Sequence, residues 1–143
     1  MIGAFLAKRK ITQSFEALSQ HDLDTFLASW KDTAYFIYPG DISVSGTIHG
    51  KPAVKKWFQN MLDQYPKIGF NIKEIWVKNT FDFLGMNVIV VHWDSDFINV
   101  QGKNVLNSGM TIINIRWGKT TLVQDYLWNM GSEFREGWGE AAA

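Results

Sequence analysis

The sequence predicts a single α+β domain, in which three N-terminal helices pack on the concave face of a curved, mainly antiparallel sheet. Helical periodicity is confined to the residues before Pro66, whereas residues 70–128 show the period of two that is typical of strands. The connections within 70–128 are too short for crossover helices, which makes the sheet antiparallel. A length of 143 residues suits one core, so the domain is expected to span residues 1–143.

Each of the three helices has a recognisable start or end. The first covers about residues 3–19, which contain no proline. The second begins after Asp22, whose carboxylate can accept from the free N–H groups of a first turn. The third opens at Gly50-Lys51-Pro52 and ends before Pro66. The apolar stripes of the second and third helices are Leu23, Phe26, Leu27 and Trp30, and Val54, Trp57, Phe58, Met61, Leu62 and Tyr65.

Six segments are expected to form strands. Residues 33–38 are β-branched or aromatic and stop at Pro39-Gly40, and residues 43–49 form a second, more polar strand. Four longer segments, residues 70–78, 87–99, 105–117 and 120–128, follow one another with short turns and predict a meander. Helices first and strands last is the α+β arrangement. The tail, residues 130–143, is rich in Gly and Glu and is expected to be partly mobile.

The strand over residues 87–99 is apolar on both faces, with Val88 and Val90 alternating against Ile89, Val91 and Trp93. The helices can cover only one face. The other, carrying Trp93 and Trp76, is expected to meet a second subunit, so the sequence predicts a homodimer through the sheet. The alternative is that curvature and the tail hide these residues within one chain.

Charge and composition exclude several classes of function. Fourteen basic and fourteen acidic residues cancel, so neither nucleic acid nor a membrane is an expected partner. The basic triplet Lys8-Arg9-Lys10 is interpreted as a solvated helix face. The absence of cysteine fits a reducing compartment, and a cytoplasmic location is expected. The three histidines lack ligand spacing and no nucleotide motif occurs, so neither a metal nor a cofactor is expected.

The first candidate site is a polar row inside an apolar strand. A period of two places His92, Asp94 and Asp96 on one face, in line with Val88 and Val90. If that face lines a pocket, desolvation raises the pKa of the acid toward neutrality and prepares it for proton transfer. The alternative is that the strand leaves the core near Asp94, which makes the acids solvated and His92 a core histidine.

The second candidate is Asp125, a single acid on the same face as Val123 and Leu127. It is either a pocket carboxylate or the acceptor of a local hydrogen bond near a sheet edge. Two carboxylates from neighbouring strands, with a histidine between them, can activate one water or shuttle a proton.

Further candidates for substrate binding are the strand-end Tyr38, the strand residue Asn107, and four side chains that are otherwise core residues by composition, Trp30, Trp57, Phe58 and Met61.

Several short motifs, in order along the chain, resemble one known family. They are His21-Asp22-Leu23-Asp24-Thr25-Phe26, Tyr38-Pro39-Gly40, Gly50-Lys51-Pro52-Ala53-Val54, Arg116-Trp117-Gly118-Lys119 and Asp125-Tyr126. Their order and spacing resemble the SnoaL-like members of the nuclear transport factor 2-like superfamily, which also holds ketosteroid isomerase and limonene epoxide hydrolase. The resemblance implies the cystatin-like α+β cone of that superfamily and a pocket beneath its helices.

The resemblance also implies site residues, with departures from each family pattern. Ketosteroid isomerases carry an Asp base where this chain has Tyr38, and SnoaL-type cyclases carry an acid at about Thr111. Limonene epoxide hydrolases use an Arg-x-Asp pair and a last-strand Asp, which His92-x-Asp94 and Asp125 resemble with His in place of Arg.

Together these observations predict a small-molecule pocket protein, namely a cofactor-free isomerase, cyclase or epoxide-hydrolase-like enzyme acting by acid/base chemistry on a small apolar oxygenated substrate. Asp125 is the predicted general base or water activator, Asp94 its partner acid, His92 the orienting group and Tyr38 a donor to substrate oxygen. The alternative is a noncatalytic hydrophobic-ligand-binding or dimerisation module. The mechanism requires that Asp94 and Asp125 converge beneath the helices.

Overall fold

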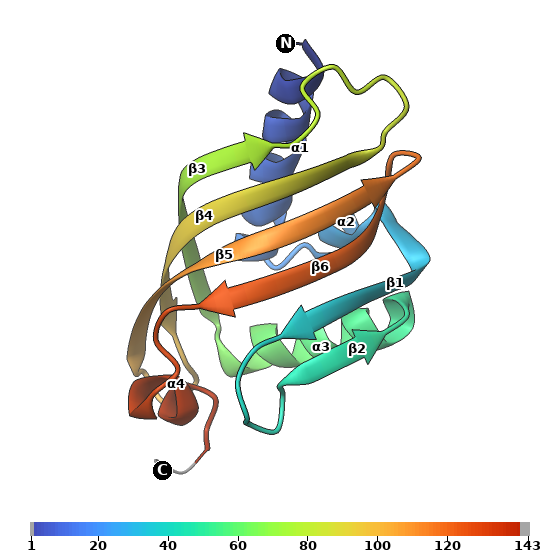
Figure 1. Ribbon diagram of the computed structural model, residues 1–143. Coiled ribbons are helices and arrows are strands. Elements are labelled where there is room, and N and C mark those ends of the chain that lie inside the picture. Colours follow the sequence, from blue (N-terminus) through green and yellow to red (C-terminus); the bar gives the residue numbers. More distant parts are fainter. Residues whose placement is uncertain (1, 141–143) are drawn as a thin grey trace.

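The computed structural model describes residues 2–140 and confirms the predicted α+β class (Figure 1). A single six-stranded sheet has the strand order β2-β1-β6-β5-β4-β3. The β1–β6 pair is parallel and the other neighbouring pairs are antiparallel. The helices are α1 (Ile2–Ser19), α2 (Leu23–Leu27), α3 (Lys51–Gln64) and α4 (Ser132–Gly137). The strands are β1 (Trp30–Tyr38), β2 (Gly46–His49), β3 (Lys67–Val77), β4 (Asn87–Ile98), β5 (Asn104–Arg116) and β6 (Lys119–Leu127).

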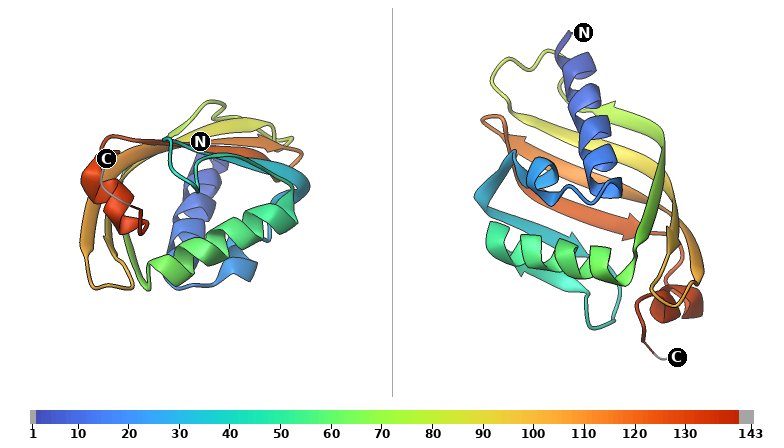
Figure 2. Two further views of the ribbon diagram at one scale, coloured as in Figure 1. Left: turned by 90° about the horizontal axis from the view of Figure 1, so that it is seen from below. Right: turned by 180° about the vertical axis from the view of Figure 1, so that it is seen from behind.

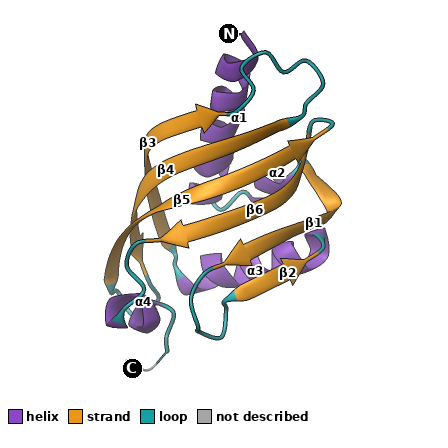
Figure 3. Cartoon of the chain, in the orientation of Figure 1, coloured by secondary structure: helices purple, strands orange, loops and turns teal. Residues whose placement is uncertain are grey.

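The first three helices cover the concave face of the curved sheet, as Figures 2 and 3 show. Aromatic side chains join the two layers. Phe15 on α1 meets Phe70 on β3 edge to face, with ring centroids 5.1 Å apart. Phe58 on α3 lies 4.9 Å from both Phe26 on α2 and Phe36 on β1. Aromatic pairs of this kind stabilise the contact by more than the apolar area that they bury. They therefore hold the helices against the concave face of the sheet.

Local signals explain where α2 and α3 begin. The Asp22 carboxylate accepts from the Thr25 backbone N–H at 3.1 Å and caps α2 as predicted. Pro52 occupies the first turn of α3, where its missing N–H has no helical partner. The α2 helix is shorter than its apolar stripe indicated, because Trp30 is already the first residue of β1.

The two faces of β4 are the reverse of the predicted assignment. Ile89, Val91 and Trp93 are buried and point toward the helices, whereas the row that contains Val88 and His92 lies on the convex face. Trp93 is only 4% exposed, so the prediction that it faces a second subunit is wrong. Trp76 does lie on the convex face and is 47% exposed. Period two groups side chains into rows, but it does not say which row is inside.

The predicted tail contains a short helix within residues 130–140. Residues 132–137 form α4, in which Phe134 and Gly137 are buried. Gly137 packs so closely that an added Cβ would lie 2.6 Å from the Tyr65 hydroxyl. The tail therefore belongs to the core at this end of the molecule. The expected mobility of residues 141–143 concerns a segment outside the described residues.

Candidate functional site

A cavity of about 340 Å³ lies between the helices and the concave face of the sheet. Apolar and aromatic side chains make up most of its wall. Of the predicted binding residues, Tyr38, Trp30, Phe58, Met61 and Asn107 line it. The layered packing therefore leaves an interior space of the size that small-molecule sites have.

Asp125 lines this cavity from β6, on the same face as Val123 and Leu127. Its Oδ1 accepts a hydrogen bond of 2.6 Å from the Thr111 hydroxyl, which belongs to its direct cross-strand partner on β5. Burial raises the pKa of Asp125 to about 7, although the Thr111 hydrogen bond acts in the opposite direction. The carboxyl is therefore poised between its two protonation states at neutral pH.

The second oxygen of Asp125 is open to the cavity. Among the described residues, every fully buried side-chain nitrogen and oxygen has a hydrogen-bond partner. Asp125 accepts only through Oδ1 from those residues, so Oδ2 must keep accessible surface. Because the side chain lines the cavity, that surface is the one a bound molecule would meet.

Trp93 orients the Thr111 hydroxyl toward Asp125. The indole Nε1–H donates to Thr111 Oγ1 at 2.9 Å, which leaves the hydroxyl proton to point at the carboxylate. Gly109 makes this possible, because an added Cβ there would lie 2.8 Å from the Trp93 ring. The sequence pattern did not identify this Trp93–Thr111–Asp125 chain. The signal available in the sequence is the glycine in a long strand, which marks a close approach to the backbone.

Tyr38 lies beside Asp125 at the strand end where it was predicted. The parallel register pairs Ile37 with Gln124, so the next residues, Tyr38 and Asp125, are neighbours across β1 and β6. The Tyr38 hydroxyl accepts from Trp138 Nε1 at 3.1 Å. Burial raises the pKa of Tyr38 well above its ordinary value, and the Asp125 charge raises it further. Tyr38 is therefore a permanent hydrogen-bond donor within the cavity.

The cavity is closed at this end by the C-terminal segment. Phe134 and Trp138 line the cavity and pack on the Tyr38 ring.

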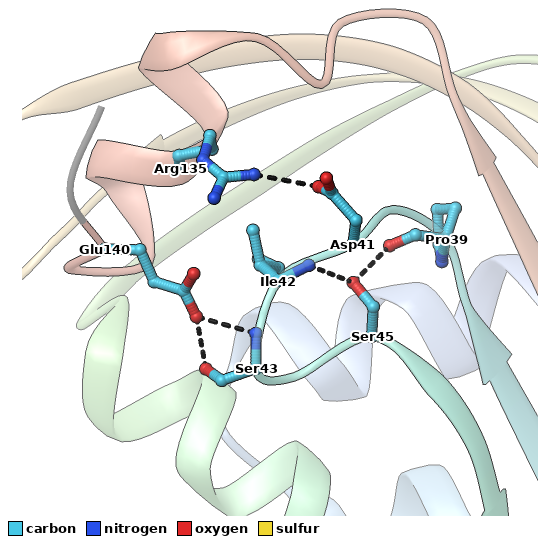
Figure 4. A network of polar contacts seen from close by, with 7 residues as sticks. All are labelled: Pro39, Asp41, Ile42, Ser43, Ser45, Arg135 and Glu140. Atoms are coloured by element: carbon cyan, nitrogen blue, oxygen red, sulfur yellow. Dashed lines mark hydrogen bonds and ion pairs between the residues drawn. The ribbon is translucent and has the colours of Figure 1, made fainter. Parts of the chain in front are cut away.

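Polar contacts on the outside hold the C-terminal segment in place (Figure 4): Arg135 donates to Asp41 at 2.8 Å, and Glu140 accepts from the backbone N–H of Ser43 at 2.7 Å. Gln64 Nε2 adds a bond of 2.7 Å to the Gly137 carbonyl. Asp125 and Tyr38 consequently lie at a closed, desolvated end.

His92 and Asp94 do not share the cavity with Asp125, and the predicted convergence of the two carboxylates is wrong. Both residues lie on the convex face with the rest of their row. Asp94 accepts from Ser108 Oγ at 2.6 Å and pairs with Lys73 Nζ at 3.4 Å, and these contacts hold its pKa below the usual range. His92 lies between the rings of Trp76 and Trp128, with centroids 6.5 and 5.0 Å away. These two residues form a surface cluster.

Two further predicted binding residues play other roles than expected. Trp57 is buried outside the cavity wall, and its Nε1–H donates to the Val44 carbonyl at 2.9 Å. Asn107 lines the cavity, but its amide is engaged with the Asn129 backbone through bonds of 2.7 and 3.1 Å. Asn107 therefore shapes the wall without offering a free polar group.

Residues 2–140 contain no group of three or more His, Asp or Glu side chains arranged to hold a metal ion. Within the same range, no helix is both long and apolar enough to cross a membrane.

The family model for the SnoaL-like domain matches residues 11–123. No curated protein matches the chain. Similar solved structures include an NTF2-like protein from Burkholderia pseudomallei, with 18% identity, 83% and 88% of the two chains covered and a TM-score of 0.72. TerC, co-crystallised with polyporic acid, gives 16% identity, coverage of 92% and 97% and a TM-score of 0.72. A protein with a ketosteroid isomerase-like fold from Catenulispora acidiphila, in complex with trimethylamine, gives 11% identity, coverage of 92% of each chain and a TM-score of 0.70.

Proposed function

The chain belongs to the SnoaL-like domain family, and on that premise we propose that its cavity binds a small apolar, oxygen-bearing molecule and that Asp125 transfers a proton to or from it. The observation that carries the proposal is that the Asp125 carboxyl group lines a mostly apolar cavity, where burial raises its pKa to about 7. Two of the similar structures, TerC and the Catenulispora acidiphila protein, were obtained with small organic molecules.

The chemistry proposed for the site needs only two side chains. Asp125 Oδ2 is the proton acceptor or water activator, and its pKa near neutrality suits general acid–base work. Tyr38 donates its hydroxyl proton to an oxygen of the bound molecule, where negative charge develops as a proton leaves. Thr111 and Trp93 fix the carboxyl orientation. The reaction class is cofactor-free isomerisation, cyclisation or hydration.

The second candidate function is binding of a hydrophobic ligand without turnover. It is favoured by the composition of the wall, in which apolar side chains predominate and the Asn107 amide is already engaged. A module for association alone is less well supported, because such a protein needs no interior space and this cavity measures about 340 Å³.

We also propose a homodimer through the convex face of the sheet. Trp76, Tyr126 and Trp128 are about half exposed there, and Val90 and Ile112 lie in the rows between them. An apolar surface of this kind is typical of an interface. The sedimentation coefficient of the purified protein tests this, and a monomer at high concentration contradicts it. We further propose a cytoplasmic location, which the absence of cysteine in the sequence favours.

The proposed activity is tested with two probes and two variants. Wild-type protein is incubated with 2-tetralone in deuterated buffer, and deuterium uptake is followed by mass spectrometry; hydration of styrene oxide is measured in parallel. Wild-type protein should accelerate at least one reaction. Asp125→Asn should lose the acceleration, whereas the matched control Asp94→Asn on the convex face should keep it.

Native mass spectrometry separates the two candidate functions. A co-purified small molecule, or saturable binding of 2-tetralone that weakens in Asp125→Asn, without acceleration of either reaction, favours the binding module. Acceleration that survives in Asp125→Asn removes the assignment of this residue as the acid–base group.

A further inference from the structure

Three segments that are far apart in the sequence meet at the end of the molecule opposite α4. They are residues 3–10 at the start of α1, residues 78–86 between β3 and β4, and residues 116–119 at the β5–β6 turn (Figure 1). The Gly118 N–H donates to the Gly85 carbonyl at 3.1 Å, and Gly3 packs against the backbone of residues 80 and 82. We call these 21 residues the rim.

The rim holds half of the large hydrophobic side chains that are exposed in the described part of the chain. Twelve such side chains occur, and six of them belong to these 21 residues. They are Phe5, Leu6, Phe81, Phe83, Leu84 and Trp117, of which Phe83 is 93% exposed. A concentration of this kind marks an interaction site rather than scattered surface residues.

The rim is also strongly basic, although the whole chain is neutral. It contains six basic residues and one acidic residue, a net charge of +5. The remainder of the chain then has eight basic and thirteen acidic residues, a net charge of −5. All six basic residues are exposed: Lys8, Arg9, Lys10, Lys78, Arg116 and Lys119. The sequence alone showed only the first three together, and the fold brings the other three to the same end.

The cavity opens within the rim. Leu6, Lys10 and Phe83 line the cavity and are themselves exposed, whereas Phe134 at the other end of the cavity is buried. The rim therefore surrounds the entrance to the cavity, while α4 closes the end that holds Asp125.

We propose that the rim docks on an anionic lipid surface. Exposed aromatic and aliphatic side chains insert at the level of the headgroups, and a surrounding set of lysine and arginine residues is attracted to anionic lipids. The combination fits a lipid surface better than the alternatives. A second copy of the same rim would bring two clusters of +5 together, and a nucleic acid would leave the six apolar side chains without partners.

Docking would place the cavity entrance against the lipid phase. An apolar molecule dissolved in the bilayer could then enter the cavity without crossing water. This consequence rests on the proposed ligand binding, but docking itself does not. The sequence-based expectation of no membrane partner rested on the zero net charge of the whole chain and on the triplet Lys8-Arg9-Lys10, whose three charges are too few for stable binding.

Co-sedimentation with vesicles tests the docking on full-length protein without any ligand. Wild-type protein is expected to pellet with vesicles of phosphatidylcholine and phosphatidylglycerol, far less with phosphatidylcholine alone, and less as salt is raised. Phe81→Ser should weaken the partition constant about ten-fold through lost apolar burial. Lys119→Gln should weaken it about five-fold, the factor for one cation at an anionic surface.

Neither Phe81 nor Lys119 lines the cavity, so failure of docking is distinguishable from failure of the proposed function. The matched control is Val100→Ser, which removes an exposed apolar side chain from the turn between β4 and β5, outside both the rim and the proposed dimer interface, and should pellet as wild type. The proposal is overturned if wild-type protein stays in solution with both vesicle types, or if Val100→Ser weakens binding as much as Phe81→Ser. It is also overturned if Phe81→Ser changes the sedimentation coefficient without vesicles, which would indicate an interface between copies of the chain.

Discussion

Asp94 and Asp125 have the same chemical group and the same kind of partner, yet they lie on opposite faces of one sheet. Each Oδ1 accepts a hydrogen bond of 2.6 Å from a hydroxyl on β5, from Ser108 for Asp94 and from Thr111 for Asp125. The pKa of Asp94 is nevertheless lowered, whereas that of Asp125 is raised to about 7. Since the hydrogen bonds match, the difference must come from the surroundings.

The two carboxyl groups differ most in their access to solvent. The Asp94 side chain is 41% exposed and has Lys73 Nζ at 3.4 Å. For Asp125, desolvation by burial raises the pKa and outweighs the Thr111 hydrogen bond, which lowers it. The comparison shows that a hydroxyl partner orients a carboxyl group in this sheet, and that the face of the sheet sets its proton affinity.

The largest expected effect is on the pH dependence of stability. Because folded Asp125 binds its proton more tightly than the unfolded chain, the free energy of unfolding should fall as pH rises from about 4 to about 7. A pKa of about 7 against 3.8 corresponds to a loss of up to about 4 kcal/mol. Asp125→Asn resembles the neutral acid, so urea denaturation should show it near wild type at pH 4 and more stable at pH 8.

Asp94→Asn provides the control of opposite sign. The lowered pKa of Asp94 means that its contribution is present above the ordinary pKa and is lost only as pH falls through the folded value. Its replacement should therefore lower stability slightly at pH 8 and leave the slope between pH 4 and 7 unchanged. If the fall in the free energy of unfolding between pH 4 and 7 persisted in Asp125→Asn and disappeared in Asp94→Asn, the raised pKa would belong to Asp94 and not to Asp125.

The next largest expected effect is on the free energy of unfolding when Gly109 or Ser108 is replaced. These neighbouring residues of β5 face opposite sides of the sheet. An added Cβ at Gly109 would lie 2.3 Å from the Tyr126 carbonyl oxygen and 2.8 Å from the Trp93 ring. Gly109→Ala should therefore cost about 2 to 3 kcal/mol, because backbone and a buried indole must both move. Ser108→Ala, on the convex side, should cost clearly less. Urea denaturation at pH 7 measures both, and equal losses would contradict the tight packing of Trp93.

The sequence predicted the rows of side chains correctly but not the face of β4. Val123, Asp125 and Leu127 were grouped on β6, and they do line the cavity together. On β4, His92 was grouped correctly with Asp94, but their row was assigned to the wrong side. Both rows of β4 are apolar in the middle, so hydrophobicity could not decide between them.

A charge criterion would have decided the face of β4. The inward row of β4, from Asn87 to Phe97, contains no charged residue, whereas the outward row contains Asp94 and Asp96. Asp125 breaks the same criterion on β6, and that exception is what makes it a site candidate. The helices, the meander and the Asp22 cap follow from local patterns. The α4 contacts and the approach of Trp93 to Thr111 depend on long-range packing, which a single sequence does not contain.

The smallest expected effect is that of the two hydroxyl partners on the carboxyl groups. Thr111→Val removes the hydrogen bond that lowers the pKa of Asp125, so this pKa should rise by about one pH unit from about 7. Ser108→Ala should raise the pKa of Asp94 by less, because water can replace the lost donor at an exposed carboxylate but not in the cavity. Titration of the side-chain carboxyl carbons by NMR measures both. If Ser108→Ala produces the larger change, solvent access does not separate the two faces, and the hydroxyl groups set the proton affinities after all.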